Sequence, residues 1–263
     1  MSRGTHRARK RFGQHFLTDV SVIRRILDAV ADSRDHAVIE IGPGLGALTE
    51  ALARRSQTLS LIEIDRDLAA RLREQYADSP SVCVVEADVL SVDWQALLAN
   101  SPDARIVGNL PYNISTPLLF RLVDVRELIH SAVFMLQKEV VDRMVAAPGS
   151  RTYGRLSVML QARFSLEHLF DVPPECFDPP PKVDSAVVYL EPLHTTDPRT
   201  DSEVFAQLVT QAFSQRRKTI RNSLRGLIDT ATIESLGIDP GKRPEALAID
   251  EFATLAGAVA ETN

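Results

Sequence analysis

The fold of this chain is constrained most by a repeated alternation of apolar runs with segments of helical periodicity. Four runs in the first half are rich in β-branched residues and apolar on both faces: Ala37–Ile41, Leu59–Ile64, Val82–Glu86 and Arg105–Val107. Helically spaced apolar residues follow, as at Leu68 and Leu72. A buried helix could explain any one run, but the regular set predicts parallel strands joined by crossover helices, and therefore an α/β fold.

The second half extends this pattern and then changes. Ala132–Leu136 and Val183–Leu190 predict two more strands, and Phe164–Phe170 is a further candidate. Residues 191–202 are polar and interrupted by prolines, as is typical of a linker. Helical spacing resumes after it, from Phe205 onward. We therefore predict an α/β domain over residues 1–192 and a small all-helical domain over residues 193–263.

Composition excludes several classes of protein. The chain has 263 residues, of which 44% are hydrophobic and 25% charged, so a collagen, a low-complexity chain and a disulfide scaffold are ruled out. Cys83 and Cys176 lie far apart and outside any CxxC motif, which predicts reduced core thiols in a cytoplasmic protein. The six histidines show no ligand spacing, so no metal site is expected. No apolar run approaches the roughly 18 residues of a membrane span.

The strongest local motif is a glycine loop after the first predicted strand, with the sequence Glu40-Ile41-Gly42-Pro43-Gly44-Leu45-Gly46. Glycines let the backbone turn tightly and approach a ligand closely. The spacing differs from the GxGxxG of dinucleotide sites, and no Lys-Ser/Thr pair follows, so a ligand with a cation and a ribose is favoured over a pyrophosphate. A tight strand-to-helix turn without a ligand is the alternative.

Two acids at the ends of the next strands sharpen this interpretation. Glu63 ends the second predicted strand, where a carboxylate can accept from both hydroxyls of a ribose. Asp88 follows the third strand, where it can accept from an exocyclic amino group. Acids at such positions are also common helix N-caps, and Asp65 is a candidate for that role. The order of loop and acids favours a cofactor that contains adenosine.

A second motif, Asn109-Leu110-Pro111-Tyr112, follows the fourth predicted strand. The side-chain carbonyl of Asn109 and the backbone carbonyl of Leu110 could accept both N–H groups of an adenine N6 amine and orient its lone pair. Pro111 would make the turn rigid, and Tyr112 offers a ring on which a base can stack. A simple turn before an N-capped helix is the alternative.

The chain resembles the KsgA family of ribosomal RNA adenine N6,N6-dimethyltransferases over nearly its whole length. Five blocks carry the resemblance: RKRFGQHFL from residue 9, EIGPGLG from 40, NLPY from 109, FDPPPKVDS from 177 and FSQRRKT from 213. The glycine loop alone indicates a methyltransferase, NLPY indicates amino-group methylation, and the outer blocks indicate this family. The resemblance implies a Rossmann-like class I fold, with a mostly parallel seven-stranded sheet covered by helices, and S-adenosylmethionine as cofactor.

The resemblance also implies roles for individual residues. The cofactor contacts map to His15, Leu17, Gly42, Gly44, Glu63, Asp88 and Asn109. The family usually has Asn at the position of His15, so that contact differs here. The catalytic set comprises Asn109, Leu110, Pro111, Tyr112 and Phe177. Phe177 matches a second aromatic wall for the target adenine opposite Tyr112, although an ordinary core Phe is a serious alternative.

Basic residues gather in two acid-free segments, which predict the path of RNA. Five lie before Asp19, and five more lie within Ser214–Arg225, so removing these ten charges from the net charge of −5 leaves −15 elsewhere. Phosphate contacts explain such clusters better than a solvated helix face. We expect RNA to contact the following residues: Arg9, Lys10, Arg11, Arg216, Arg217, Lys218 and Arg221.

These observations favour an enzyme that dimethylates two adjacent adenosines in the 3′-terminal hairpin of small-subunit rRNA and contributes to subunit biogenesis. The expected partner is the small ribosomal subunit, without a membrane or a metal, and the expected state is a cytoplasmic monomer. Alternatives are a large-subunit rRNA methyltransferase of the erythromycin-resistance type and a non-catalytic assembly factor. A small-molecule methyltransferase or a nucleotide-binding oxidoreductase would leave the basic clusters unexplained.

Overall fold

The computed structural model describes residues 14–31, 33–99, 101, 103–194, 197–215 and 217–262. The chain forms two compact units, the first made of Met1–Val141 and Glu167–Pro192, the second of Asp142–Leu166 and Leu193–Asn263. The chain changes unit after Pro192. Residues 142–166, however, group with the C-terminal segment rather than with the α/β domain in which the sequence prediction placed them. Within the second unit the Gly149 N–H donates to the Glu245 carbonyl (2.6 Å), and the Tyr153 ring meets Phe213 edge-on.

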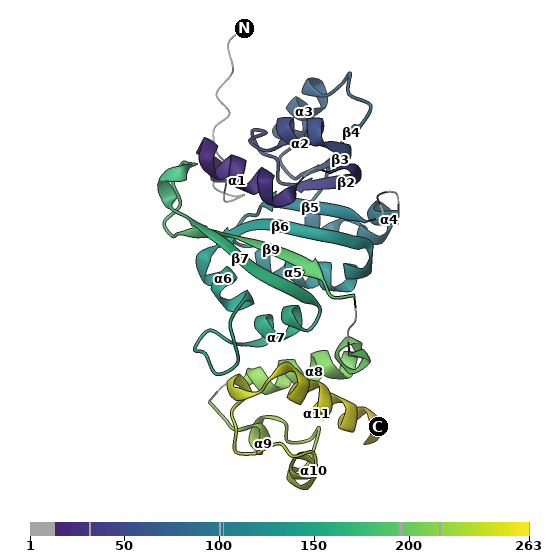
Figure 1. Ribbon diagram of the computed structural model, residues 1–263, viewed down its shortest axis with the longest axis vertical. Helices are drawn as coiled ribbons and strands as arrows, with labels where there is room; N and C mark the ends of the chain where they lie inside the picture. The colour runs from purple at the N-terminus through teal and green to yellow at the C-terminus, as the bar shows by residue number, and fades with distance from the viewer. Residues whose placement is uncertain are drawn as a thin grey trace. The chain divides into compact units, whose positions relative to one another are not determined.

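A seven-stranded sheet organises the α/β part of the chain, in the order β4-β3-β2-β5-β6-β9-β7 (Figure 1). Neighbouring strands from β4 to β6 are parallel, and β6 and β9 are antiparallel. The bounds of the strands are β2 Ser33–Ile41, β3 Ser56–Glu63, β4 Val82–Glu86, β5 Ala104–Asn109, β6 Ile129–Gln137, β7 Phe164–Val172 and β9 Ser185–Pro192. Each predicted run falls largely within one of these strands, so the predicted α/β fold with a mostly parallel sheet is confirmed.

Helices cover both faces of this sheet. They are α1 (Val20–Val30), α2 (Thr49–Arg55), α3 (Arg66–Gln75), α4 (Trp94–Ala99), α5 (Ser115–Asp124) and α6 (Lys138–Met144). Apolar residues of α1, α2 and α3, among them Ile26, Leu52 and Leu72, form one core with Val38 and Val107 of the strands. The strand residues of opposite parity are buried as well, since Ile39, Ile106 and Phe134 are at most 1% exposed. Burial on both faces explains why the strands are continuous apolar runs.

The strand order changes direction beside β2, which has β3 on one side and β5 on the other. In parallel sheets, ligands bind beyond the carboxyl ends of the strands at such a switch point. Ile41 and Gly108 are register partners at the ends of β2 and β5. The glycine loop and the Asn109 motif therefore leave the sheet side by side.

Two local predictions differ from the structure. Cys83 is exposed, because its strand β4 lies at the edge of the sheet, whereas Cys176 is buried as expected. The helical spacing predicted from Phe205 onward is interrupted at residues 224–228, because α9 (Ile220–Ser223) ends before them and the chain turns at Gly226, which has a φ of +92°.

The second unit packs its helices around an apolar core. These helices are α7 (Arg155–Gln161), α8 (Glu203–Ser214), α9, α10 (Thr230–Ser235) and α11 (Ile249–Thr262). Phe205, Leu208, Phe252 and Leu255 are fully buried at helical spacing on α8 and α11. No helix within the described residues combines the length and the hydrophobicity that a membrane-spanning segment needs.

Candidate active site

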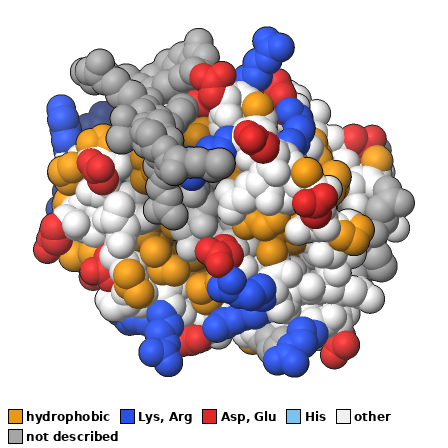
Figure 2. Space-filling view, turned by 90° about the horizontal axis from the view of Figure 1, so that it is seen from above, with side chains coloured by type: hydrophobic (Ala, Val, Ile, Leu, Met, Phe, Trp, Pro, Cys, Tyr) orange, Lys and Arg blue, Asp and Glu red, His pale blue; other side chains and the backbone are white. Residues whose placement is uncertain are grey.

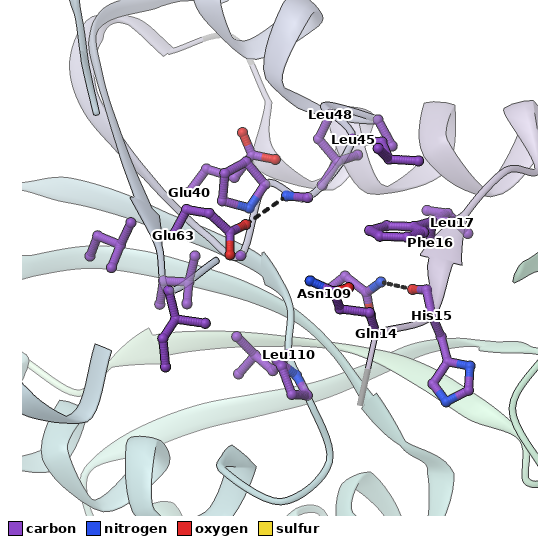
Figure 3. Close-up of a pocket in the computed structure, with 18 of the residues that line it drawn as sticks. Gln14, His15, Phe16, Leu17, Glu40, Leu45, Leu48, Glu63, Asn109 and Leu110 are labelled. Carbon is purple, nitrogen blue, oxygen red and sulfur yellow. Dashed lines mark hydrogen bonds between the residues drawn. The ribbon is translucent and has the colours of Figure 1, made fainter. Parts of the chain in front are cut away.

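A pocket of about 610 Å³ opens at the carboxyl ends of the parallel strands (Figure 3). Its walls come from residues 14–18 and Ile23, the glycine loop with its flanks (40–48), the end of β3 (62–64), the start of the turn after β4 (87–89) and residues 109–114. All of these residues belong to the first unit. Pockets of this size suit ligands as large as a nucleoside derivative.

The glycine loop has the backbone that its sequence predicts. Gly42 and Gly44 have φ values of +66° and +58°, a region that residues with a Cβ atom rarely adopt. A Cβ atom on Gly44 would also lie 3.2 Å from two ring carbons of Phe16. The loop is fixed to the next strand, because the Gly42 N–H donates to the Ile62 carbonyl (2.9 Å). The loop therefore approaches the pocket as bare backbone.

The carboxylate of Glu63 is held by two backbone donors on the wall of the pocket. Its Oε2 accepts from the Gly44 N–H at 3.1 Å, and its Oε1 accepts from the Asp65 N–H at 2.8 Å. Burial raises the pKa of Glu63, and these two hydrogen bonds oppose the shift. A carboxylate has about four acceptor positions. Two of them remain for a ligand.

Glu40 places a second acid in the same part of the pocket (Figure 3). It is only 2% exposed, and burial raises its pKa to about 8; the Thr49 hydroxyl opposes this shift, and the charge of Glu63 adds a smaller contribution to it. Its Oε2 has no hydrogen-bond partner among the described residues. A buried carboxyl oxygen without a partner is costly, and a cationic ligand group would supply the missing interaction.

Asp88 lines the pocket and Asp65 does not, although both residues follow a strand. Asp65 is the N-cap of α3, where its Oδ1 accepts from the Asp67 N–H, and it is absent from the described residues that line the pocket. Asp88 lines the pocket and also caps a short 3₁₀ turn through its Oδ1, which accepts from the Leu90 N–H at 2.9 Å.

Hydrogen bonds orient the Asn109 motif in the pocket wall. The Asn109 Nδ2 donates to the His15 carbonyl at 3.0 Å, which assigns Oδ1 as the acceptor end of the amide (Figure 3). The Pro111 carbonyl accepts from the Ile114 N–H and from the Ser115 hydroxyl, so it is already engaged. The turn is therefore rigid for two reasons, the proline ring and these two bonds.

The Tyr112 ring is fixed at its polar end. Its hydroxyl lies 2.9 Å from the Oγ of Ser185, which is 1% exposed at the start of β9. Burial raises the pKa of Tyr112, so the phenol stays neutral. The ring that lies parallel to it belongs to His15, with centroids 6.1 Å apart and an angle of 22° between the planes. The His15 Nδ1 is within 2.7 Å of the Pro179 carbonyl, which holds the imidazole in place.

Phe177 lies in the apolar core of the first unit. It pairs with Leu17 in the small β1–β8 sheet (Phe16–Leu17 with Phe177–Asp178), is 4% exposed, and belongs to the apolar core around Ile26. Among the described residues that line the pocket, Phe177 is absent. Its role as a second aromatic wall for the target adenine stays a prediction. In this structure Phe177 is an ordinary core residue.

Most of the predicted site residues meet in the pocket, and several lining residues were not predicted. Ten predicted residues line it: His15, Leu17, Gly42, Gly44, Glu63, Asp88, Asn109, Leu110, Pro111 and Tyr112. Four apolar residues also line it without a predicted role: Phe16, Leu45, Leu48 and Ile64. Their position next to the glycine loop and the strand ends was the available signal.

The predicted RNA-binding residues are only partly described. Arg9, Lys10, Arg11 and Arg216 lie outside the described residues. Arg217, Lys218 and Arg221 are exposed in the second unit, after α8 and on α9. None of these three forms an ion pair with another described residue, which leaves their charges available to phosphates.

Comparison with known proteins identifies the family. The family model described as "Ribosomal RNA adenine dimethylase" matches residues 5–261. The chain belongs to this family. Adenine dimethylases of this family use S-adenosylmethionine, and the residues of the pocket fit this cofactor. Glu40 would hold its ammonium group through a buried oxygen, Glu63 would accept from its ribose hydroxyls, and the bare backbone of the glycine loop allows a close approach.

Individual dimethylase relatives resemble the chain over almost its full length. "Ribosomal RNA small subunit methyltransferase A" of Bordetella avium is 53% identical over 97% of this chain and 96% of its own length. The protein of that name from Dechloromonas aromatica is 52% identical over 95% and 97%. Among solved structures, a dimethyladenosine transferase from Plasmodium falciparum superposes with a TM-score of 0.80 at 26% identity, covering 92% of this chain and 96% of its own. The 23S rRNA methyltransferase ErmE gives a TM-score of 0.73 at 27% identity, over 93% and 99%.

Proposed function

We propose that this chain transfers methyl groups from S-adenosylmethionine to N6 of two adjacent adenosines in the 3′-terminal hairpin of small-subunit rRNA, giving N6,N6-dimethyladenosine. The identity to named relatives carries the proposal, and the position of the Asn109 motif agrees with it. Relatives named as small-subunit rRNA methyltransferases are above 50% identical over at least 95% of the chain, and the Asn109–Tyr112 motif lines the cofactor pocket. We further propose that the partner is an assembling small subunit and that the chain acts in the cytoplasm.

Different pocket residues hold different chemical groups of the cofactor. Glu63 accepts from the ribose hydroxyls, Asp88 accepts from the exocyclic amine of the cofactor's adenine, and Glu40 pairs with its ammonium group. The bound cofactor supplies an electrophilic methyl group on a sulfonium. His15, Leu17 and the backbone of Gly42 and Gly44 complete the walls.

The Asn109 motif orients the target base. The N6 amine of adenine is a poor nucleophile, because its lone pair is delocalised into the ring. Asn109 Oδ1 and the Leu110 carbonyl accept its two N–H groups, which localises the lone pair and points it at the methyl group. Tyr112, fixed through Ser185, provides the stacking surface. Orientation and charge placement then supply most of the rate enhancement, and no general base is needed before transfer.

RNA affinity comes from basic side chains outside the pocket. Arg217, Lys218 and Arg221 are exposed and contact phosphates, together with Arg9, Lys10, Arg11 and Arg216. The face in Figure 2 carries Lys and Arg side chains among Asp, Glu and hydrophobic side chains.

The test is methylation of small subunits that lack this modification. The chain is incubated with labelled S-adenosylmethionine and unmethylated small or large subunits, followed by nucleoside analysis and primer extension on both rRNAs. We expect dimethyladenosine at two adjacent positions near the 3′ end of small-subunit rRNA. A stop confined to large-subunit rRNA would support the second candidate, an activity like that of ErmE, with which the TM-score of 0.73 is consistent. Subunit binding without any label would leave only an assembly role and refute the proposal.

A further inference from the structure

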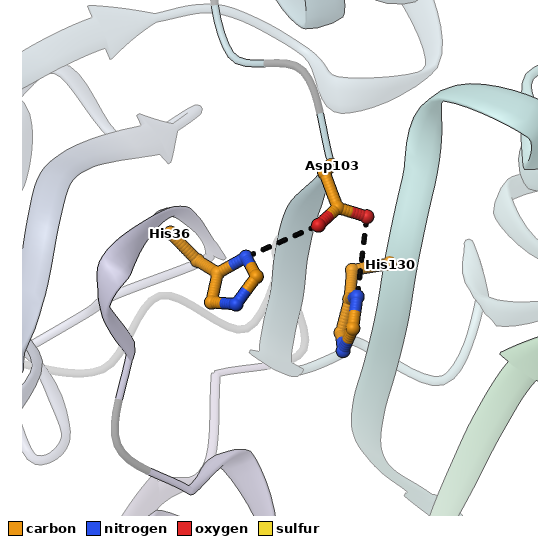
Figure 4. Close-up of side chains that lie close together, drawn as sticks. All are labelled: His36, Asp103 and His130. Atoms are coloured by element: carbon orange, nitrogen blue, oxygen red, sulfur yellow. Dashed lines mark hydrogen bonds and ion pairs between the residues drawn. The ribbon is translucent and has the colours of Figure 1, made fainter.

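Three polar side chains meet at the opposite end of the sheet from the pocket (Figure 4). His36 lies near the start of β2, Asp103 directly precedes β5, and His130 lies near the start of β6. Because β2, β5 and β6 are adjacent and parallel, their amino-terminal ends lie side by side. Asp103 is six residues before Asn109 along β5, which corresponds to about 20 Å. The cluster is therefore separate from the methyl-transfer site.

Asp103 bridges the two histidines of the cluster. Each histidine contacts a different oxygen of the same carboxylate. His36 Nδ1 lies 3.2 Å from Oδ2 of Asp103, and His130 Nδ1 lies 3.1 Å from Oδ1. One ligand atom from each side chain lies within 4.8 Å of the other two. Tetrahedral zinc with bonds of about 2.0–2.2 Å has neighbouring ligand atoms about 3.3–3.6 Å apart. Both histidine–carboxylate separations are thus close to the ligand spacing of such a site.

We propose that His36, Asp103 and His130 bind one zinc ion. Two imidazole nitrogens and one carboxylate oxygen form a donor set typical of zinc, and water completes the four ligands. The side chains remain accessible, with exposed fractions of 26% for His36, 36% for His130 and 59% for Asp103, so the ion has an entry path. The widest separation closes by rotation of these partly exposed side chains.

The backbone supports this assignment. Asp103 has a φ of +57°, in the left-handed region that few residues other than glycine adopt. Its carboxylate bridges the Nδ1 atoms of the two imidazole rings, whose centroids are 4.8 Å apart. A bound ion would join the amino-terminal ends of three central strands. It would therefore stabilise the folded α/β unit, with no direct contact to the cofactor pocket.

The test measures zinc binding by the untagged, metal-free full chain. Equilibrium dialysis gives the stoichiometry and the dissociation constant, and Co²⁺ absorption reports tetrahedral coordination. The variants are His36→Gln, His130→Gln and Asp103→Asn. The matched control is His168→Gln, because His168 also pairs with a single exposed acid, Asp171, at 2.8 Å, but has no second histidine beside it among the described residues.

We expect one zinc ion per chain, a tetrahedral cobalt spectrum, and a zinc-dependent rise of the melting temperature in the wild-type chain and in His168→Gln. Each of the three ligand variants should weaken zinc binding by at least about tenfold and lose the thermal shift. Circular dichroism verifies that each variant is folded, and the isosteric Asp103→Asn keeps the test informative if a histidine variant is unstable.

Two results would overturn the proposal. The first is the absence of stoichiometric zinc binding, which would identify the cluster as a carboxylate hydrogen-bonded between two imidazoles. The second is zinc binding that all three ligand variants retain. Neither readout depends on methyl transfer, so the outcome is independent of the proposed function.

Discussion

Replacing Glu63 by Gln tests the cofactor site most directly, because the side chain keeps its size and loses its charge. In the structure both carboxylate oxygens accept from backbone donors, Gly44 N–H at 3.1 Å and Asp65 N–H at 2.8 Å. A glutamine can accept only through its single oxygen. Its NH₂ group must then face one of these two N–H groups, and neither can accept.

The substitution should change two quantities that can be measured separately, the free energy of unfolding and the Kd for the cofactor. One buried backbone N–H loses its acceptor, which should lower the free energy of unfolding of the free protein by about 1–3 kcal/mol. The hydroxyls of the bound ribose lose charge-assisted hydrogen bonds, which are about twice as strong as neutral ones. Two such bonds correspond to about 1.4–2.8 kcal/mol, so the Kd for S-adenosylmethionine should rise about 10- to 100-fold.

Calorimetric titration with S-adenosylmethionine and unfolding in urea measure the two parts separately. Glu86→Gln is the matched control, because Glu86 is the register partner of Glu63 on β4 and forms an exposed ion pair with Arg73 (2.9 Å) outside the pocket. An exposed pair contributes about 0–1 kcal/mol, so this variant should unfold and bind almost like the wild-type chain.

Two outcomes would refute the assignment of Glu63. Cofactor binding by Glu63→Gln within about threefold of the wild-type Kd would mean that the carboxylate makes no charge-assisted bond to the ligand. An equal loss of affinity in Glu86→Gln would mean that net charge near the pocket, rather than Glu63 itself, sets the affinity.

Three further predictions concern the remaining pocket residues. Asn109→Ala should lower the methyl-transfer rate about 10²- to 10³-fold while subunit binding is retained, measured by label incorporation and by co-sedimentation; full activity would remove Asn109 from the mechanism. Ser185→Ala removes the partner that lies 2.9 Å from the Tyr112 hydroxyl and should lower kcat/KM about 5- to 30-fold. Adding Tyr112→Phe should restore part of this loss. An unchanged kcat/KM in Ser185→Ala would contradict the positioning role of Ser185. The pKa of Glu40 rises from 4.5 in the unfolded chain to about 8 in the folded chain, so the native state binds an extra proton between these pH values. The free energy of unfolding of the free protein should therefore fall as the pH rises from about 4.5 to 8. In Glu40→Gln this pH dependence should weaken, which urea unfolding across the range measures.

The strands and the pocket could be predicted because their signals are local. A strand buried on both faces must be apolar at consecutive positions, and every such run in the first unit falls largely within a strand of the sheet. Parallel strands bring their carboxyl ends to one edge, so acids and glycines at strand ends predict a common site. Glu63 and Asn109 meet in the pocket for this reason.

Other features depend on packing that leaves no periodic signal. The position of Phe177 follows from its pairing with Leu17 in two strands of two residues each, which are too short to show alternation. The grouping of residues 142–166 with the C-terminal segment rests on contacts such as Gly149 with Glu245, almost a hundred residues apart. A linker after residue 192 was visible in the sequence, whereas this second passage between the units lies at Val141, within α6, where no break in composition marks it.

The cluster of His36, Asp103 and His130 shows that the same topological rule applies at both edges of a parallel sheet. Their spacing in the sequence matches no metal motif, because the three residues lie on separate strands and become neighbours only through the order β2-β5-β6. That order is the one that brings Gly42 beside Asn109 at the carboxyl edge. Cofactors bind at the carboxyl ends of parallel strands, but adjacent parallel strands bring their amino ends together as well. Polar residues at the starts of neighbouring parallel strands are therefore a signal for clusters of this kind, and the strand order decides which of them meet.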